Sequence, residues 1–181
     1  MTAQDEELFV HYVERGAEPW NSSLAAAWLD YELRAWVLPR LPARRPLAAC
    51  NVGIGVGLWD DWLGHVLGTG GSLVSVDRDP SICRVFAHRQ RRERHPHPAR
   101  VLCGDIVDGV LGALRFDVIT IVGSTLREAD DPRVRGMLHG ALADGGCMLS
   151  AEVGTGAVPE STPGVEVRVF DEMWIRLERA G

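Results

Sequence analysis

A glycine-rich turn is the first feature of the sequence that points to chemistry. The segment NVGIGVG, residues 51–57, follows a short apolar run and precedes a segment of helical periodicity. Gly53, Gly55 and Gly57 allow the backbone to turn tightly and a ligand to approach it closely, and the start of a helix offers unpaired N–H groups to that ligand. A tight turn without a ligand is the alternative interpretation.

Two carboxylates follow the next predicted strands. Asp77 ends the second strand, where a carboxylate can accept hydrogen bonds from both hydroxyl groups of a ribose. Asp105 follows the third strand, where it could accept a hydrogen bond from an adenine amino group or, alternatively, cap the short helix after it. Asp79 stands before Pro80 and is expected to cap a helix.

The composition excludes several classes of chemistry. The chain of 181 residues has 19 basic residues, and every one is an arginine. Without lysine there is no Schiff-base or pyridoxal-phosphate lysine and no phosphate loop of the GxxxxGK[ST] type. The formal charge of −6 argues against a nucleic-acid binder held by phosphate contacts. The four cysteines stand singly, so we expect buried thiols and no metal site.

The sequence shows no sign of export or membrane insertion. Residues 1–7 are acidic and polar, unlike the basic and then apolar start of a signal peptide. No apolar run approaches the ~18 residues of a membrane span. We therefore expect a cytoplasmic protein in a reducing compartment, with no membrane partner and with a homo-oligomer left open.

Apolar patterning separates a helical start from a region of alternating strands and helices. Residues 1–45 are predicted to form a helical N-terminal cap on residues 46–181, the two making one structural domain. Amphipathic helices are predicted over 6–15, about 22–38, 58–67, 81–94 and 134–143. Strands are predicted over 47–52, 72–76, 100–103, 116–122 and 147–153, and VEVRVF with MWIRLER predicts a final antiparallel hairpin.

This alternation predicts a parallel, doubly wound sheet. Ligands of such sheets bind beyond the carboxyl ends of the strands. The turns at 53–57, 77–80, 104–106 and 123–126 should therefore share one edge of the sheet.

Taken in order, these motifs resemble those of the class I S-adenosylmethionine-dependent methyltransferases. The resemblance covers residues 47 to about 178 and is carried by NVGIGVG, LVSVDRDP, CGDIVD, FDVITIVG and LADGGCMLSAEV. It implies an α/β fold, a three-layer sandwich around a seven-stranded, mostly parallel sheet of order 3-2-1-4-5-7-6. It also implies S-adenosyl-L-methionine as cofactor, bound by residues of these motifs: Asn51, Gly53, Gly55, Gly57, Asp77, Arg78, Asp105, Ile106 and Gly123.

The resemblance also implies which part of the cofactor each motif holds. The glycine turn would wrap the methionine part, Asp77 would bind the ribose, and Asp105 with Ile106 would contact the adenine. The family usually has an acid where Asn51 stands, so the attraction for the cofactor's ammonium group should be weaker here. Residues 154–164 are too short and too rich in helix breakers for the helix that usually joins the fifth and sixth strands.

A dinucleotide-binding oxidoreductase is the nearest rival on the same kind of sheet. Its GxGxxG pattern needs a glycine at position 58, where this chain has Leu58. The predicted antiparallel end of the sheet also favours the methyltransferase layout.

The catalytic residues are less easily assigned, because a well-positioned sulfonium methyl needs a base only when the acceptor must lose a proton. His11 or Tyr12 of the cap could be that base. Ser124, in the turn after the fourth strand, and Glu152, at the end of the fifth, could contact the acceptor. His11 could instead lie at the surface of a packed helix, and Glu152 could cap a loop.

We therefore predict an enzyme, a methyltransferase acting on a small metabolite and not on nucleic acid. The bias toward Ala, Gly and Arg suggests a GC-rich bacterial genome and a role in specialised metabolism. Two alternatives stay open: an aminocarboxypropyl transferase or cyclase that releases methylthioadenosine, and a non-catalytic binding protein. The arginine-rich stretch 84–100 is expected to be a solvated helix face, and Arg127 is the first arginine to inspect for an inward-turned guanidinium.

Overall fold

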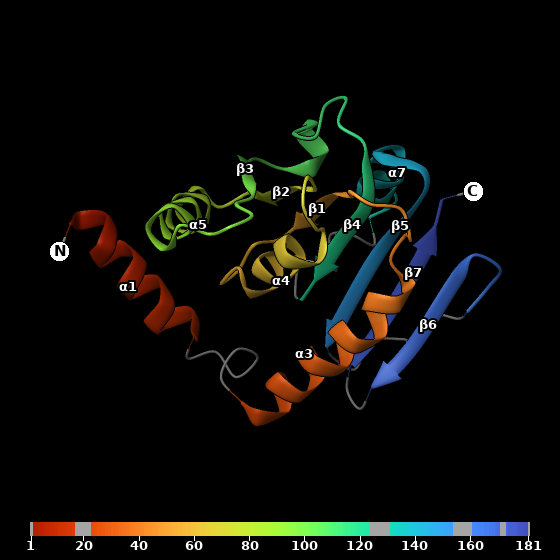
Figure 1. Cartoon of the computed structure of the whole chain (residues 1–181), viewed down its shortest axis with the longest axis horizontal. Coiled ribbons are helices and arrows are strands. Elements are labelled where there is room, and N and C mark those ends of the chain that lie inside the picture. Colours follow the sequence, from red (N-terminus) through yellow and green to blue (C-terminus); the bar gives the residue numbers. More distant parts are fainter. Residues whose placement is uncertain (1, 17–22, 124–130, 154–160, 171–172, 181) are drawn as a thin grey trace.

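The computed structural model describes residues 2–16, 23–123, 131–153, 161–170 and 173–180 (Figure 1). A seven-stranded sheet runs through its centre in the order β3-β2-β1-β4-β5-β7-β6, which confirms the predicted order. The strands from β3 to β5 pair in parallel, and β7 pairs antiparallel with both β5 and β6. The strands are β1 Ala48–Val52, β2 Ser72–Asp77, β3 Arg100–Cys103, β4 Phe116–Val122, β5 Leu142–Val153, β6 Val165–Phe170 and β7 Met173–Arg179.

The start and the end of α5 are set by capping residues. The side chain of Asp79 accepts a hydrogen bond from the N–H of Ser81 at 2.8 Å, so Asp79 caps α5 as predicted, and Arg94 ends that helix with a φ of 51°. The helices are α1 Ala3–Gly16, α3 Leu24–Val37, α4 Leu58–Val66, α5 Pro80–Glu93 and α7 Pro132–Gly140, with short 3₁₀ turns η1 Leu38–Arg40 and η2 Ile106–Asp108. None of these described helices is long and apolar enough to span a bilayer.

Two apolar cores lie on opposite faces of the sheet, because alternate strand residues point to opposite sides. Ala49 belongs to the core beneath α3 and α4, whereas its neighbour Cys50 belongs to the core beneath α7 and η2. The helix α3 contributes Trp36 and Val37 to the first core, so part of the predicted cap is built into the sandwich itself.

The start of β5 differs from the prediction. The predicted helix over 134–143 ends at Gly140, and β5 begins at Leu142 instead of 147. Leu142 pairs with Phe116 of β4, and the register then shifts before Val118 pairs with Cys147. Asp144, Gly145 and Gly146 therefore lie within β5, where its pairing with β4 is irregular. The sequence pattern had predicted that these three residues end a helix.

The cysteines follow the prediction with one exception. Cys50, Cys83 and Cys147 are buried free thiols, but Cys103 at the end of β3 is exposed. That strand lies at the edge of the sheet, so one side of it has no neighbouring strand to cover it.

A buried cluster of charges joins β7 to α7 on the second face. The carboxylate of Glu178 forms ion pairs with Arg135 and with His139 of α7, the latter at 3.2 Å. Its other oxygen lies 3.0 Å from Nε of Arg176, also on β7. Glu178 is 4% exposed and Arg176 is 9% exposed, so water solvates neither charge well. Each charge is therefore stabilised mainly by its partner of opposite sign.

We predict that Glu178→Gln lowers the free energy of unfolding by about 3 kcal/mol, because it leaves the buried Arg176 and the half-buried Arg135 without their anion. Urea unfolding at pH 7 measures the change. Glu166→Gln is the control, since Glu166 pairs with Arg40 at 3.0 Å on an exposed strand face and should cost less than about 1 kcal/mol. Equal losses in the two variants would contradict the interpretation.

Candidate functional site

The turns after the first four strands lie at one edge of the sheet, as predicted. Val52 at the end of β1 pairs with Val76 of β2 and with Ile121 of β4, and Asp77 pairs with Cys103 of β3. The N–H of Gly53 donates to the carbonyl of Val76 at 2.8 Å, so the turn leaves β1 without breaking the ladder. Residues 53–57, 77–80 and 104–106 thus share an edge with Gly123, while 124–126 lie outside the described residues.

The glycine turn needs glycine at its third position for packing. Gly53, Gly55 and Gly57 have φ values of 87°, 54° and 77°, which side chains rarely adopt. A Cβ on Gly57 would also stand 2.4 Å from the ring of Phe86 on α5, whereas one on Gly55 would meet open space. Gly57 therefore lets α4 and α5 approach each other, and Gly55 leaves the top of the turn uncovered.

Asp77 fastens the glycine turn to the end of β2. One carboxylate oxygen accepts from the N–H of Ile54 at 2.9 Å and the other from the N–H of Asp79 at 2.9 Å. A carboxylate has about four acceptor positions, so each oxygen keeps one for a ligand hydroxyl. The side chain is half-buried at the edge where a ligand would bind.

Asp105 caps the turn that follows β3. Its side chain accepts from the N–H of Val107 at 3.0 Å, as the capping alternative suggests. Ile106 is buried in the core below it, Arg78 is exposed, and the N–H of Gly123 donates to the carbonyl of Ala151 at 3.0 Å. The capping oxygen of Asp105 is thus engaged within the chain, and a role toward adenine stays a prediction.

The helix α1 reaches the glycine turn through two side chains. Tyr12 donates its hydroxyl to the carbonyl of Val56 at 2.8 Å, and Nε2 of His11 lies 3.4 Å from the carbonyl of Gly55. Burial raises the pKa of Tyr12 to about 12, an effect that the nearby Arg89 only partly offsets. Tyr12 is therefore a protonated hydrogen-bond donor near neutral pH in this arrangement.

The helix α1 is held on α5 by opposite charges. The carboxylate of Glu7 lies 2.8 Å from the guanidinium of Arg84, and that of Asp5 lies 3.1 Å from His88 and 3.4 Å from Arg92. Figure 1 shows the two helices side by side at the β3 end of the molecule. Arg84 and Arg92 are exposed, as expected for a solvated helix face, although both pair with acids far away in the sequence. The expectation was wrong for the half-buried His88 and for the buried Arg89.

Arg89 is a buried arginine that binds the glycine turn from below. Its Nη2 lies 2.6 Å from both carboxylate oxygens of Asp61 and 3.4 Å from the carbonyl of Gly57. The guanidinium also lies over the rings of Phe86 and Tyr12, 5.2 and 5.5 Å from their centres. It thereby connects α5, α4 and α1 at the turn.

A layer of four buried polar side chains lies beneath the same turn. The amide of Asn51 donates to the carbonyl of Gly53 and to the carboxylate of Asp60, each at 3.0 Å. The hydroxyl of Thr120 donates to the amide oxygen of Asn51 at 2.8 Å, and that of Ser75 donates to Asp60 at 2.5 Å. Both amide hydrogens of Asn51 are thus used within the chain, and the layer joins β4, β1, α4 and β2.

Asp60 is the charge-bearing member of this layer. It is 0% exposed, and burial raises the pKa of its carboxyl to about 7, although the hydrogen bonds from Ser75 and Asn51 act in the opposite direction. The carboxylate of Asp61, next to it in α4, raises the pKa further. Asp60 is therefore poised to change its charge near neutral pH.

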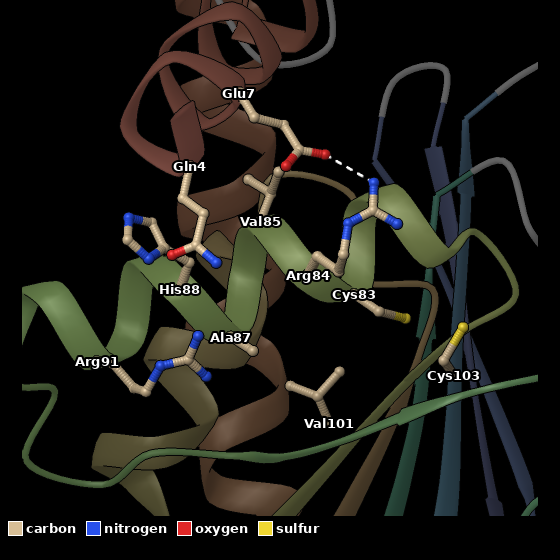
Figure 2. A pocket seen from close by; sticks show the side chains of 10 residues that line it. All are labelled: Gln4, Glu7, Cys83, Arg84, Val85, Ala87, His88, Arg91, Val101 and Cys103. Atoms are coloured by element: carbon tan, nitrogen blue, oxygen red, sulfur yellow. Dashed lines mark hydrogen bonds and ion pairs between the residues drawn. The ribbon is translucent and has the colours of Figure 1, made fainter. Parts of the chain in front are cut away.

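A cavity of ≈390 Å³ lies beside this edge, between α1, α5 and β3 (Figure 2). Figure 2 shows Glu7 and Arg84 joined across its rim and Cys83 and Cys103 at one end. Neither the glycine turn nor Asp77 nor Asp105 lines it. The cavity is thus separate from the predicted cofactor site.

The remaining predicted residues have these positions. Ser124 and Arg127 lie outside the described residues, as do 154–160 of the predicted loop, and the side chain of Glu152 on β5 is not among those described. Asp60 and Arg89 were missed by the sequence reasoning. Their only signal was position, an acid in the first turn of the helix after the glycine turn and an arginine on the inner side of α5.

The sequence and the structure were compared with those of known proteins. No protein-family model matches the sequence, and no curated protein matches it either. Among solved structures, a SAM-dependent methyltransferase from Aquifex aeolicus is similar over 100% of both chains, with 12% identity and a TM-score of 0.64. The fold is that of the class I methyltransferases.

Two further structures with this methyltransferase fold are longer than the present chain. Coclaurine N-methyltransferase, bound to N-methylheliamine and SAH, is 14% identical, with 74% of this chain and 39% of that chain covered and a TM-score of 0.57. The [4+2]-cyclase SpnF is 19% identical, with 72% and 48% covered and a TM-score of 0.59. At such identities the likeness establishes the fold and leaves the reaction open.

We predict that Asp60→Asn changes how stability depends on pH. Asp60 has a folded pKa of about 7 against 3.8 when unperturbed, so its contribution to stability is full below pH 4 and is lost as pH rises toward 7. An asparagine can accept from Asn51 and donate to Ser75 without this penalty. Urea unfolding gives the difference in free energy of unfolding between the variant and the wild type. From pH 5 to pH 8 this difference should shift in favour of the variant by at least ~1.4 kcal/mol, the equivalent of one pKa unit. Parallel pH profiles would refute the raised pKa.

Proposed function

We propose that this chain binds S-adenosyl-L-methionine at the turns after β1, β2 and β3 and transfers its methyl group to a small molecule. The observation that carries the proposal is the hydrogen bond from the N–H of Ile54, in the glycine turn, to the carboxylate of Asp77. It brings a half-buried carboxylate, a backbone bend and the start of α4 together at the ligand-binding edge of a methyltransferase fold. Membership of a bacterial specialised pathway and a cytoplasmic location remain part of the proposal.

The residues at this edge fit the cofactor chemically. The half-buried Asp77 retains acceptor positions for ribose hydroxyl groups, and open space above Gly55 leaves the turn accessible. The first turn of α4 points its N–H groups toward the same turn, which suits the carboxylate of the methionine part. Gly123 follows β4 with a φ of 101° and would border the methyl side of the site.

The protein's contribution to this reaction is mainly positioning. When bound, the cofactor supplies an electrophilic methyl group on a sulfonium. Asp77 and the glycine turn orient the nucleoside and the amino-acid part, and Arg89, Tyr12 and Asn51 keep the turn in place through its carbonyl groups. In this proposal Tyr12 holds the turn, and His11, Ser124 and Glu152 remain the candidates for contact with the acceptor.

A small acceptor fits the charge distribution better than a nucleic acid. The net charge is −6, and the basic residues Arg84, His88 and Arg92 on α5 are engaged by acids of α1. A polyanion would therefore meet a repulsive surface on average and would have to displace α1 from this stretch. We accordingly propose a small-molecule acceptor.

Asp77→Ala should weaken S-adenosylmethionine binding at least tenfold, about 1.4 kcal/mol or more. The substitution removes the ribose acceptor and also releases the N–H groups of Ile54 and Asp79. Isothermal titration calorimetry measures the dissociation constant. Asp79→Ser is the control, because serine keeps the helix cap and should leave affinity within about twofold. Equal affinities of Asp77→Ala and wild type would remove the proposed site.

Product analysis separates methyl transfer from the other uses of the cofactor. Incubation with S-adenosylmethionine and a panel of small nucleophiles should yield S-adenosylhomocysteine, detected by mass spectrometry. Methylthioadenosine instead would show attack on the aminocarboxypropyl chain. Unchanged cofactor despite measurable binding across the panel would favour a non-catalytic binding protein.

A further inference from the structure

The buried carboxyl of Asp60 lies one residue layer below the glycine turn and has no cation of its own among the described residues. Its hydrogen-bond partners are the neutral side chains of Ser75 and Asn51. The cation nearest in the network, Arg89, is taken up by the carboxylate of Asp61. A buried anion that lacks a positive partner is costly, and proteins normally pair or neutralise such a group.

The connection from Asp60 to the ligand side passes through a single side chain. Asn51 donates one amide hydrogen to Asp60 and the other to the carbonyl of Gly53, the first residue of the turn. Thr120 fixes the amide from the β4 side, so the group cannot rotate without losing a hydrogen bond. The charge state of Asp60 is therefore coupled to the dipoles of Asn51 and of the peptide at Gly53.

We propose that Asp60, acting through Asn51, is a positioning residue whose carboxylate is the buried counter-charge of the cofactor's ammonium group. This inference rests on the proposed function, which brings a cation to the glycine turn. An ionised Asp60 draws the amide hydrogens of Asn51 toward itself and leaves the carbonyl of Gly53 more negative. Binding of the ammonium group in turn favours the ionised form, so Asp60 releases a proton when the cofactor binds.

The groups that surround Asp60 support this coupling. Cys50 on β1 interacts electrostatically with Asp60, and burial raises the pKa of its thiol, so it stays neutral. Asp61 is compensated by Arg89, and His11 of α1 contacts the outer side of the turn at Gly55. Because His11 is a second ionisable side chain beside the same turn, the test must compare variants at Asp60 and not pH values alone.

The test is calorimetry of the full chain with S-adenosylhomocysteine, which keeps the ammonium group and is not consumed. Titrations at pH 7 in phosphate and in Tris, two buffers of different ionisation enthalpy, give the number of protons released. The wild type should release roughly 0.3 to 0.5 proton, and its affinity should rise about threefold to tenfold between pH 6 and pH 8. Methylthioadenosine, which lacks the ammonium group, should bind without this release.

Two variants assign the proton to Asp60. Asp60→Asn should abolish the release and flatten the pH dependence. Asp144→Asn, at an exposed carboxylate near the start of β5 and at the opposite end of the sheet, should leave both unchanged. Ser75→Ala removes a hydrogen bond that lowers the pKa of Asp60, so the rise in affinity should move to higher pH. This variant keeps the carboxyl and serves as the second test if Asp60→Asn does not fold.

The outcomes distinguish this inference from the proposed function. Binding of S-adenosylhomocysteine with no proton release in the wild type, or with the same release in Asp60→Asn, overturns the role of Asp60 and leaves the cofactor site intact. Absence of any binding to the folded wild type overturns the cofactor site itself, and the inference with it.

Discussion

The backbone of the turn after β1 is held by side chains from four different elements. Asn51 binds the carbonyl of Gly53 from β1, and Asp77 binds the N–H of Ile54 from β2. His11 and Tyr12 approach the carbonyls of Gly55 and Val56 from α1. Arg89 approaches the carbonyl of Gly57 from α5 and is itself paired with Asp61 of α4. A glycine-rich segment loses more conformational freedom on folding than any other, so it keeps one conformation only when many partners define it. The shape of the ligand-binding edge depends on this constraint.

The same constraint explains why polar groups are buried beneath the turn. The four-membered layer of Asn51, Asp60, Ser75 and Thr120 takes the place of apolar packing between α4 and the strands, at the cost of desolvating a carboxyl. The cost is reduced because Asp60 lies in the first turn of α4, where the helix dipole favours negative charge. An apolar layer could fill the volume, but it could not donate to the carbonyl of Gly53. The layer therefore exchanges some stability for a defined turn.

The sequence predicted those parts of the molecule that depend on local pattern. Alternating apolar runs placed the strands, the order of motifs placed their neighbours, and Asp79 was assigned as the cap of α5 from its position before Pro80. It did not predict the start of β5 at Leu142, because that strand is fixed by pairing with Phe116, which lies far away in the chain. It also missed Asp60 and Arg89. Whether a charged residue is buried depends on what packs against it. The hydrogen-bond partners of Asp60 lie on β1 and β2, and Asp61, the partner of Arg89, lies on α4.

The arginines of α5 show how tertiary structure gives one residue type two roles. Arg84 and Arg92 lie on the outer side, more than half exposed, and meet Glu7 and Asp5 of α1 in pairs that salt can screen. Arg89 lies on the inner side, 5% exposed, and its pair with Asp61 is shielded from solvent and ions. The outer ion pairs that attach α1 are accordingly the weaker ones. The hydrogen bond from Arg89 to the carbonyl of Gly57 does not depend on them. The turn is thus held from β1, β2 and α5 by contacts that do not involve α1.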